Sequence, residues 1–128
     1  MAFRKLHKPA RINTGDPTVS IGLSGNGRQA FLALSRGARQ MLGDPIAVYL
    51  EWDEEASLMR IVASSLEDPA AYKVTGSTSR ISVTRVLREL DLTPQHTMRF
   101  LARRDSRLSI VIDLTPMVEA PTLRTVAA

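Results

Sequence analysis

Residues 47–63 read AVYLEWDEEASLMRIVA, and this stretch decides the fold. From Val48 to Trp52 every second residue is apolar, which is the period of a strand with one buried face. The polar run at 54–57 predicts a turn, and residues 58–63 return as a second apolar strand. The stretch therefore predicts a β-hairpin.

The residues before this hairpin predict two further strands and a helix. The expected elements are a strand at 18–23, a tight turn at 24–27, a strand at 30–34 and a helix at 36–42. An Asn-Gly pair in the turn suits backbone with positive φ. Ser35 is a suitable N-cap for the helix, and Gly43 stands where a left-handed C-cap is needed.

The same order of elements recurs in the second half of the chain. The expected elements are a strand at 72–75, a turn at 76–79, a short strand at 80–81, a helix at 83–90 capped by Ser82, and a hairpin of 98–102 and 108–114 that turns at 104–107. Its apolar positions follow those of the first hairpin at one constant offset, as in Val48 with Met98 and Ile61 with Val111. Upstream, Arg28 corresponds to Arg80.

The repeat predicts one α+β, mostly β domain at 17–114, made of two related β-β-α-β-β-like halves at 17–64 and 71–114. A single half is too small to bury a two-sided sheet, so two halves packed about a pseudo-twofold axis would share one core. Residues 1–16 and 115–128 are expected to be extended arms. The first arm is basic through Arg4, Lys5, Lys8 and Arg11.

Composition limits the classes of function. The chain has 128 residues, no cysteine, and 17 Lys and Arg against 13 Asp and Glu, which gives a net charge of +4. The absence of cysteine excludes disulfides, thiolate metal sites and a cysteine nucleophile. No secretory leader or membrane span is recognisable, so a soluble cytoplasmic protein is expected.

No catalytic constellation is recognisable. The acidic run at 53–55 belongs to a hairpin tip, where charge is expected without any chemistry. The glycines at 24–28 lack the Gly-Lys-Ser/Thr ending of a phosphate loop. His7 and His96 lie far apart in the sequence, with no partner of a triad or metal site nearby. We therefore expect a protein that is not an enzyme and has no metal or cofactor.

The first half resembles the AbrB/MazE-type DNA-binding domain, a swapped-hairpin barrel. The resembling residues are Val19, Ile21, Gly27-Arg28, the helix end Arg39-Gln-Met-Leu-Gly43, Val48-Tyr-Leu50 and Leu58-Met-Arg-Ile61. The second half is similar through Arg80-Ile81, Val86-Leu-Arg-Glu-Leu90 and its hairpin. Family members supply one half per chain and dimerise, whereas both halves would lie in this one chain. The family commonly has a proline before its helix, where this chain has serine.

The resemblance implies a small transcriptional regulator that contacts double-stranded DNA through arginines on turns and short helices. Those residues would be Arg28, Arg36 and Arg39 in the first half, Arg80, Arg85 and Arg88 in the second, and the basic N-terminal arm with Arg4, Lys5, Lys8 and Arg11. Guanidinium groups suit this role because they bind phosphate and guanine edges bidentately.

A second class of function stays open: a protein-interaction module that uses its arms and strand edges, as an assembly subunit or an inhibitor. Self-association stays open as well. Arginines gathered on one face would favour DNA, whereas arginines paired with Glu51, Glu54, Glu55 and Glu89 would favour a protein partner.

Overall fold

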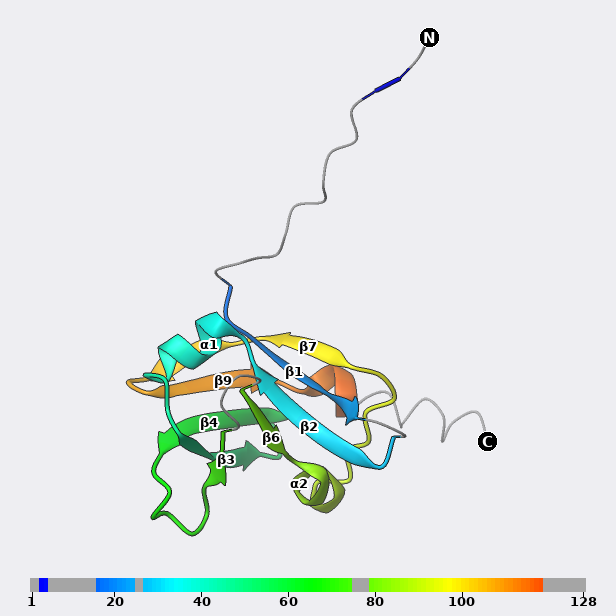
Figure 1. Ribbon diagram of the computed structural model, residues 1–128. Helices are drawn as coiled ribbons and strands as arrows, with labels where there is room; N and C mark the ends of the chain where they lie inside the picture. Colours follow the sequence, from blue (N-terminus) through cyan, green and yellow to red (C-terminus); the bar gives the residue numbers. More distant parts are fainter. Residues whose placement is uncertain (1–2, 5–15, 25–26, 75–78, 119–128) are drawn as a thin grey trace.

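The computed structural model (Figure 1) describes residues 3–4, 16–24, 27–74 and 79–118. The first half contains β1 (Thr18–Ser24), β2 (Gln29–Leu34), α1 (Arg36–Met41), β3 (Ala47–Asp53) and β4 (Leu58–Ser64). The second half contains β5 (Tyr72–Lys73), β6 (Arg80–Ser82), α2 (Thr84–Glu89), β7 (Met98–Leu101), β8 (Arg103–Ser106) and β9 (Ser109–Asp113). The mostly β architecture and the order of elements expected from the sequence are confirmed.

The strands form two antiparallel sheets. One sheet has the order β6-β2-β1-β7 and the other the order β5-β3-β4-β9-β8. Only Ala102 separates β7 from β8, so one bent strand runs from an edge of the first sheet to an edge of the second. Among the described strands no pairing joins β5 to β6, so the expected barrel is not closed. Figure 1 looks onto the four-stranded sheet, with the five-stranded sheet behind it.

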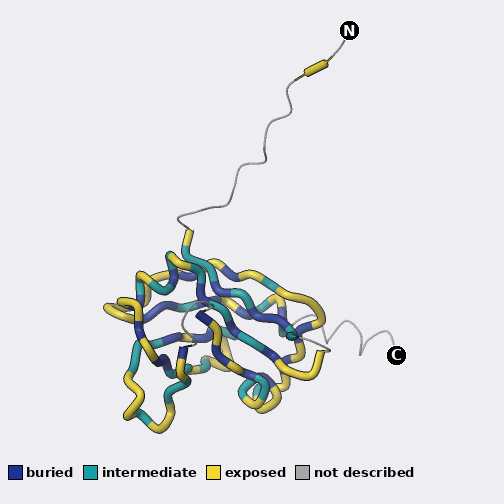
Figure 2. The backbone as a smooth tube through the Cα atoms, in the orientation of Figure 1, coloured by how far each residue is buried: buried dark blue, intermediate teal, exposed yellow. Residues whose placement is uncertain are grey.

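The core lies between the two sheets and is closed by the short helices (Figure 2). Alternate residues of β1 point inward, and Val19 and Ile21 are fully buried. In the opposite sheet, Ile61 of β4 pairs with Ile110 of β9 and Met59 of β4 pairs with Ile112, and the three isoleucines have no exposed surface. The alternation of apolar residues in the sequence thus decides which face of each sheet is buried in the core.

Helix α1 begins and ends as expected. The Ser35 hydroxyl accepts hydrogen bonds from the backbone N–H of Ala38 at 3.1 Å and of Thr18 at 2.8 Å. Ser35 therefore caps α1 and ties it to the start of β1. Gly43 follows the helix with φ +78°, the left-handed conformation in which glycine is favoured.

Helix α2 differs from the expectation at its start. Ser82 belongs to β6 and is exposed, the N-cap is Val83, and no side chain caps the helix by a hydrogen bond. The hydroxyl of Thr84, at the first helical position, instead accepts the N–H of Ala30 at 2.9 Å. This threonine links α2 to β2 of the other half, a link that its sequence position alone did not indicate.

The last hairpin turns later than expected. Residues 103–106, expected to include the turn, form β8, and the chain reverses at Arg107 and Leu108, where Leu108 has φ +64°. As a result Ile61 pairs with Ile110 and is buried, whereas Val111 lies on the outer face. The constant offset between the halves, which equated Ile61 with Val111, is therefore wrong in the last strand.

The packed part of the chain continues beyond residue 114. Residues 115–118 are helical and Met117 is buried in the core. The Asp113 carboxylate accepts the Thr115 N–H at 2.9 Å and the Thr115 hydroxyl at 2.6 Å. In the ranges that the structure describes, no helix has the length and apolar character needed to cross a membrane.

Candidate nucleic-acid interface

The first group of arginines lies where the β1–β2 turn meets α2. Arg28 from the turn and Arg88 from α2 line the same hollow of about 210 Å³. Gly27 leads into it with φ +82°, and its N–H donates to the Ser24 carbonyl at 3.1 Å. Arg85 is also exposed on α2. The structure thus brings together a turn of the first half and the helix of the second half.

The second group lies where α1 meets the end of the β5–β6 connection. Arg39 of α1 donates a hydrogen bond to the hydroxyl of buried Ser79 at 2.7 Å, and its Nε lies 3.6 Å from an Asp44 carboxylate oxygen. Its side chain is 27% exposed, so Arg39 mainly holds the two segments together. Arg36, one turn earlier in the helix, is exposed.

Arg80 stands beside this second group on β6. Its guanidinium lies 4.2 Å from the centre of the Phe31 ring on the neighbouring strand, a cation–π contact. This contact holds the Arg80 guanidinium over the Phe31 ring, and the residue as a whole stays exposed. Arg80 is therefore oriented and accessible.

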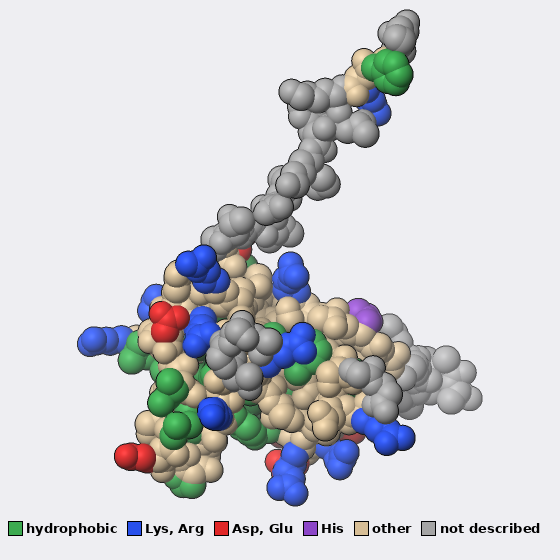
Figure 3. All heavy atoms as spheres, in the orientation of Figure 1, with side chains coloured by type: hydrophobic (Ala, Val, Ile, Leu, Met, Phe, Trp, Pro, Cys, Tyr) green, Lys and Arg blue, Asp and Glu red, His purple; other side chains and the backbone are tan. Residues whose placement is uncertain are grey.

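The elements that carry the candidate arginines, α1, β6, α2 and the β1–β2 turn, lie around the sheet that faces the viewer in Figure 1. Figure 3 shows Lys and Arg side chains from the α1 end of this face to the α2 end, with only scattered acidic side chains. None of the three ion pairs in the described part of the chain joins a candidate arginine to Glu51, Glu54, Glu55 or Glu89.

The structure describes only one basic residue of the N-terminal arm. Arg4 is exposed, whereas Lys5, Lys8 and Arg11 lie outside the described residues. A further arginine on the same face, Arg99 of β7, is not among those singled out from the sequence. Its signal is the alternation of Arg99 with inward-facing Met98 and Phe100, which places it on the outer face of a strand.

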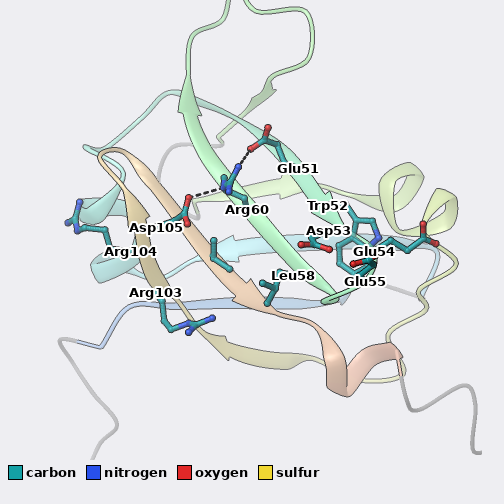
Figure 4. Close-up of a pocket in the computed structure, with 11 residues that line it drawn as sticks. Glu51, Trp52, Asp53, Glu54, Glu55, Leu58, Arg60, Arg103, Arg104 and Asp105 are labelled. Atoms are coloured by element: carbon teal, nitrogen blue, oxygen red, sulfur yellow. Dashed lines mark hydrogen bonds and ion pairs between the residues drawn. The ribbon is translucent and has the colours of Figure 1, made fainter.

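A second and larger hollow, of about 690 Å³, lies on the opposite sheet (Figure 4). Arg60 on β4 forms ion pairs of 2.9 Å with Glu51 and with Asp105. The hydrogen bond from Arg60 to Glu51, together with the charge of Asp105, raises the pKa of Arg60. Arg103 and Arg104 lie on the β8 side of Arg60 in Figure 4.

This hollow has a mixed character that does not suit a polyanion. The acidic run at 53–55 lies at its far end, on the β3–β4 turn, and the Ala56 N–H bonds to the Asp53 carboxylate at 3.1 Å. In the described ranges no group of three or more His, Asp or Glu side chains is placed to hold a metal ion. Asp53 ends β3 and residues 54–57 form the turn, so the expected hairpin tip is confirmed.

Comparison with known proteins gives no match: no family model, no curated protein and no solved structure matches the chain.

Proposed function

We propose that this chain is a small transcriptional regulator that binds double-stranded DNA through arginines on its turns and short helices. The observation that carries the proposal is the gathering of exposed arginines from both halves on one face, around the four-stranded sheet. Arginine forks bind phosphate oxygens bidentately, and such contacts fix a protein on the duplex.

A pseudo-twofold relation between the halves supports this proposal. Four backbone hydrogen bonds recur in α1 and α2, with donors Arg39, Leu42, Gly43 and Asp44 in the first helix and Leu87, Leu90, Asp91 and Leu92 in the second. The same spacing of 48 residues separates each donor from its counterpart and each acceptor from its counterpart. The residue after each C-cap also has positive φ, +78° at Gly43 and +57° at Asp91.

Four of the strand pairings fit the same symmetry, whereas β1·β2 and β3·β4 have no paired counterpart among the described strands of the second half. Exchanging the halves leaves the pairs β2·β6 and β4·β9 unchanged, and it converts β1·β7 into β5·β3. Each half thus lends its first strand to the second hairpin of the other half, which is the arrangement expected of a swapped-hairpin fold. The Arg28 turn packs on α2, while Arg39 of α1 holds Ser79 at the equivalent turn.

Two equivalent arginine-bearing corners suit a duplex because its backbone also repeats along a groove. A pseudo-symmetric chain can place one corner on each side of a single site, as a symmetric dimer does with two subunits. The backbone contacts would supply affinity, and sequence preference would come from any arginine that reaches base edges.

The test is binding of a short fluorescein-labelled duplex, followed by fluorescence anisotropy over a salt series. Wild type should bind at low salt, with affinity that falls as salt rises. The double variant Arg28→Ala/Arg80→Ala removes one exposed arginine from each half. We expect weaker binding and a shallower salt slope, reduced by about two because two phosphate contacts are lost.

The matched control is Arg103→Ala/Arg104→Ala, which removes the same charge from the opposite sheet. It should retain wild-type affinity, and circular dichroism should show both double variants folded. Absence of binding by wild type at low salt would contradict the proposed function.

One observation favours a protein partner as the second candidate function. Strand β8 is an edge strand, and its four residues, Arg103–Ser106, are all exposed. An exposed edge offers unpaired backbone groups to an added strand. This second function would be supported if the chain does not bind DNA but does bind a protein partner. The variant Asp105→Pro, which blocks the strand edge, should then abolish binding of that partner.

A further inference from the structure

The outer face of the four-stranded sheet is free of acidic side chains. Its outward positions are Thr18, Ser20, Gly22 and Ser24 on β1, Gln29, Phe31 and Ala33 on β2, Arg80 and Ser82 on β6, and Arg99 and Leu101 on β7. The charged residues among them are two arginines, on the two edge strands. This sheet face therefore attracts anions along its whole width.

The two arginines lie on one straight row across the sheet. The strand registers pair Arg80 with Ala33, Ala33 with Ser20, and Ser20 with Arg99. Three strand spacings separate the two arginine backbones, which is about 14 Å. The major groove of B-DNA is about 12 Å wide, so two side chains at this separation can reach the phosphates on either side of it.

The side chains in the middle of the row are small. Ala33 and Ser20 carry small side chains, so a duplex can approach the sheet closely between the arginines. The next row passes through Ser82, Phe31 and Gly22 and adds no charge. Gly22 itself is covered by Thr97, which a β-carbon at Gly22 would strike.

Neither arginine forms an ion pair with another described residue. In the described part of the chain the three ion pairs involve Arg39 and Arg60, and none involves Arg80 or Arg99. Arg80 is held by its stacking on Phe31 at 4.2 Å, and Arg99 is exposed. Positive charge held beside an uncharged, closely approachable surface is what a polyanion needs.

From this row we propose that the sheet face itself is a contact surface for the sugar–phosphate backbone of a DNA duplex. The major groove faces Ala33 and Ser20, and Arg80 and Arg99 contact the phosphates on its two sides. This proposal rests on the proposed DNA-binding function and adds to it the surface that carries sequence-independent affinity. Arg99 becomes a binding residue that neither the turns nor the helices supply.

The test uses the full chain and three variants of the row that leave Arg28, Arg80 and both helices intact. Arg99→Ala should weaken binding about threefold to fivefold at low salt, the effect of one exposed ion pair, and lower the salt slope by about one. Ser20→Glu should cause a loss at least as large, whereas Ser20→Lys should strengthen binding. Opposite changes in affinity from two substitutions at the same position would show that the charge of the side chain, and not its size, is responsible.

Two unrelated duplex sequences should show the same fold-change for each variant, since phosphate contacts carry no base information. Arg104→Ala on the opposite sheet is the matched control and should leave affinity unchanged. Ser20 and Arg99 are partners on neighbouring strands, so their substitution could also affect stability. Unfolding midpoints in urea therefore check that each variant is folded.

Three results would overturn the proposal in distinguishable ways. Wild type that does not bind DNA removes both this surface and the proposed function. Binding that is lost in Arg28→Ala/Arg88→Ala but unchanged in Arg99→Ala and Ser20→Glu removes the sheet-face contact alone. An equal loss in Arg104→Ala would show that only net charge matters, and would also remove the sheet-face contact.

Discussion

At the scale of single residues, Ser35 and Ser82 offer a direct comparison. The Ser35 hydroxyl accepts two backbone N–H groups, whereas exposed Ser82 caps nothing. Ser35→Ala should lower the free energy of unfolding by about 1–2 kcal/mol, because a capped helix start and a tie to β1 are both lost. Ser82→Ala should change it by less than about 0.5 kcal/mol.

Urea unfolding followed by the fluorescence of the single tryptophan, Trp52, measures both changes. Equal losses in the two variants would contradict the assignment of Ser35 as the cap. The sequence predicts a serine cap at both positions, because both serines precede a helical pattern. Only the second is displaced, since β6 extends through Ser82 in order to pair with Phe31.

Gly43 combines a left-handed backbone with a close neighbour. Its φ is +78°, and a β-carbon there would lie 2.9 Å from the Cδ2 of Leu108. Gly43→Ala should cost about 1–2 kcal/mol, mainly for the left-handed conformation, because the end of the Leu108 side chain can move away. Gly43→Asn should cost less in the same unfolding assay, since asparagine tolerates this conformation better. A larger loss for asparagine would indicate that space near Leu108 dominates instead.

At the scale of elements, the helical residues 115–118 are joined to β9 through Asp113. The Thr115 hydroxyl, and then the Thr115 N–H, lower the pKa of Asp113 below its usual value. A lowered carboxyl pKa adds stability at pH values above the unfolded pKa of about 3.9, and this stability is lost as the pH falls through the folded value.

Asp113→Asn should therefore be less stable than wild type at pH 7, and the difference should shrink as the solution is made acidic. Thermal unfolding at neutral and at acidic pH measures this. Thr115→Val removes the largest cause of the shift and should remove part of the same pH dependence. A difference between wild type and Asp113→Asn that does not change with pH would rule out this role.

Elements with a buried face are the ones that the sequence predicts well. The alternation between Val48 and Trp52 defines β3, and the apolar return defines β4. Strand β8 carries no such signal because its four residues are all exposed. Its place is decided by pairing with β9, and a register shift between Arg104 and Ser106 accompanies it.

At the scale of the whole molecule, the pairing of strands from different halves cannot be predicted from local sequence patterns. The contacts β1·β7 and β2·β6 join segments far apart in the chain, and together with β1·β2 they decide that Arg99 shares a face with Arg80. The six arginines predicted on turns and helices lie around that same face, although Arg39 is engaged with Ser79 and Asp44. The sequence thus indicates the arginines of the turns and helices as candidates, whereas Arg99 enters the candidate site only through the strand pairing.

The pseudo-twofold proposal also predicts stoichiometry. Because both halves lie in one chain, a single copy should occupy a short duplex. Sedimentation of the labelled complex should give one protein per duplex at saturation. Two copies per duplex would indicate that self-association, left open by the sequence, completes the binding site.

The most direct test of the central claim is an amide NMR titration of the full chain with a short duplex. The proposed DNA-binding face predicts shift changes at the β1–β2 turn, α1, β6, α2 and Arg99, with little change along β4 and β8. Changes concentrated around Arg60 and Asp105 on the opposite sheet, or none at low salt, would contradict it.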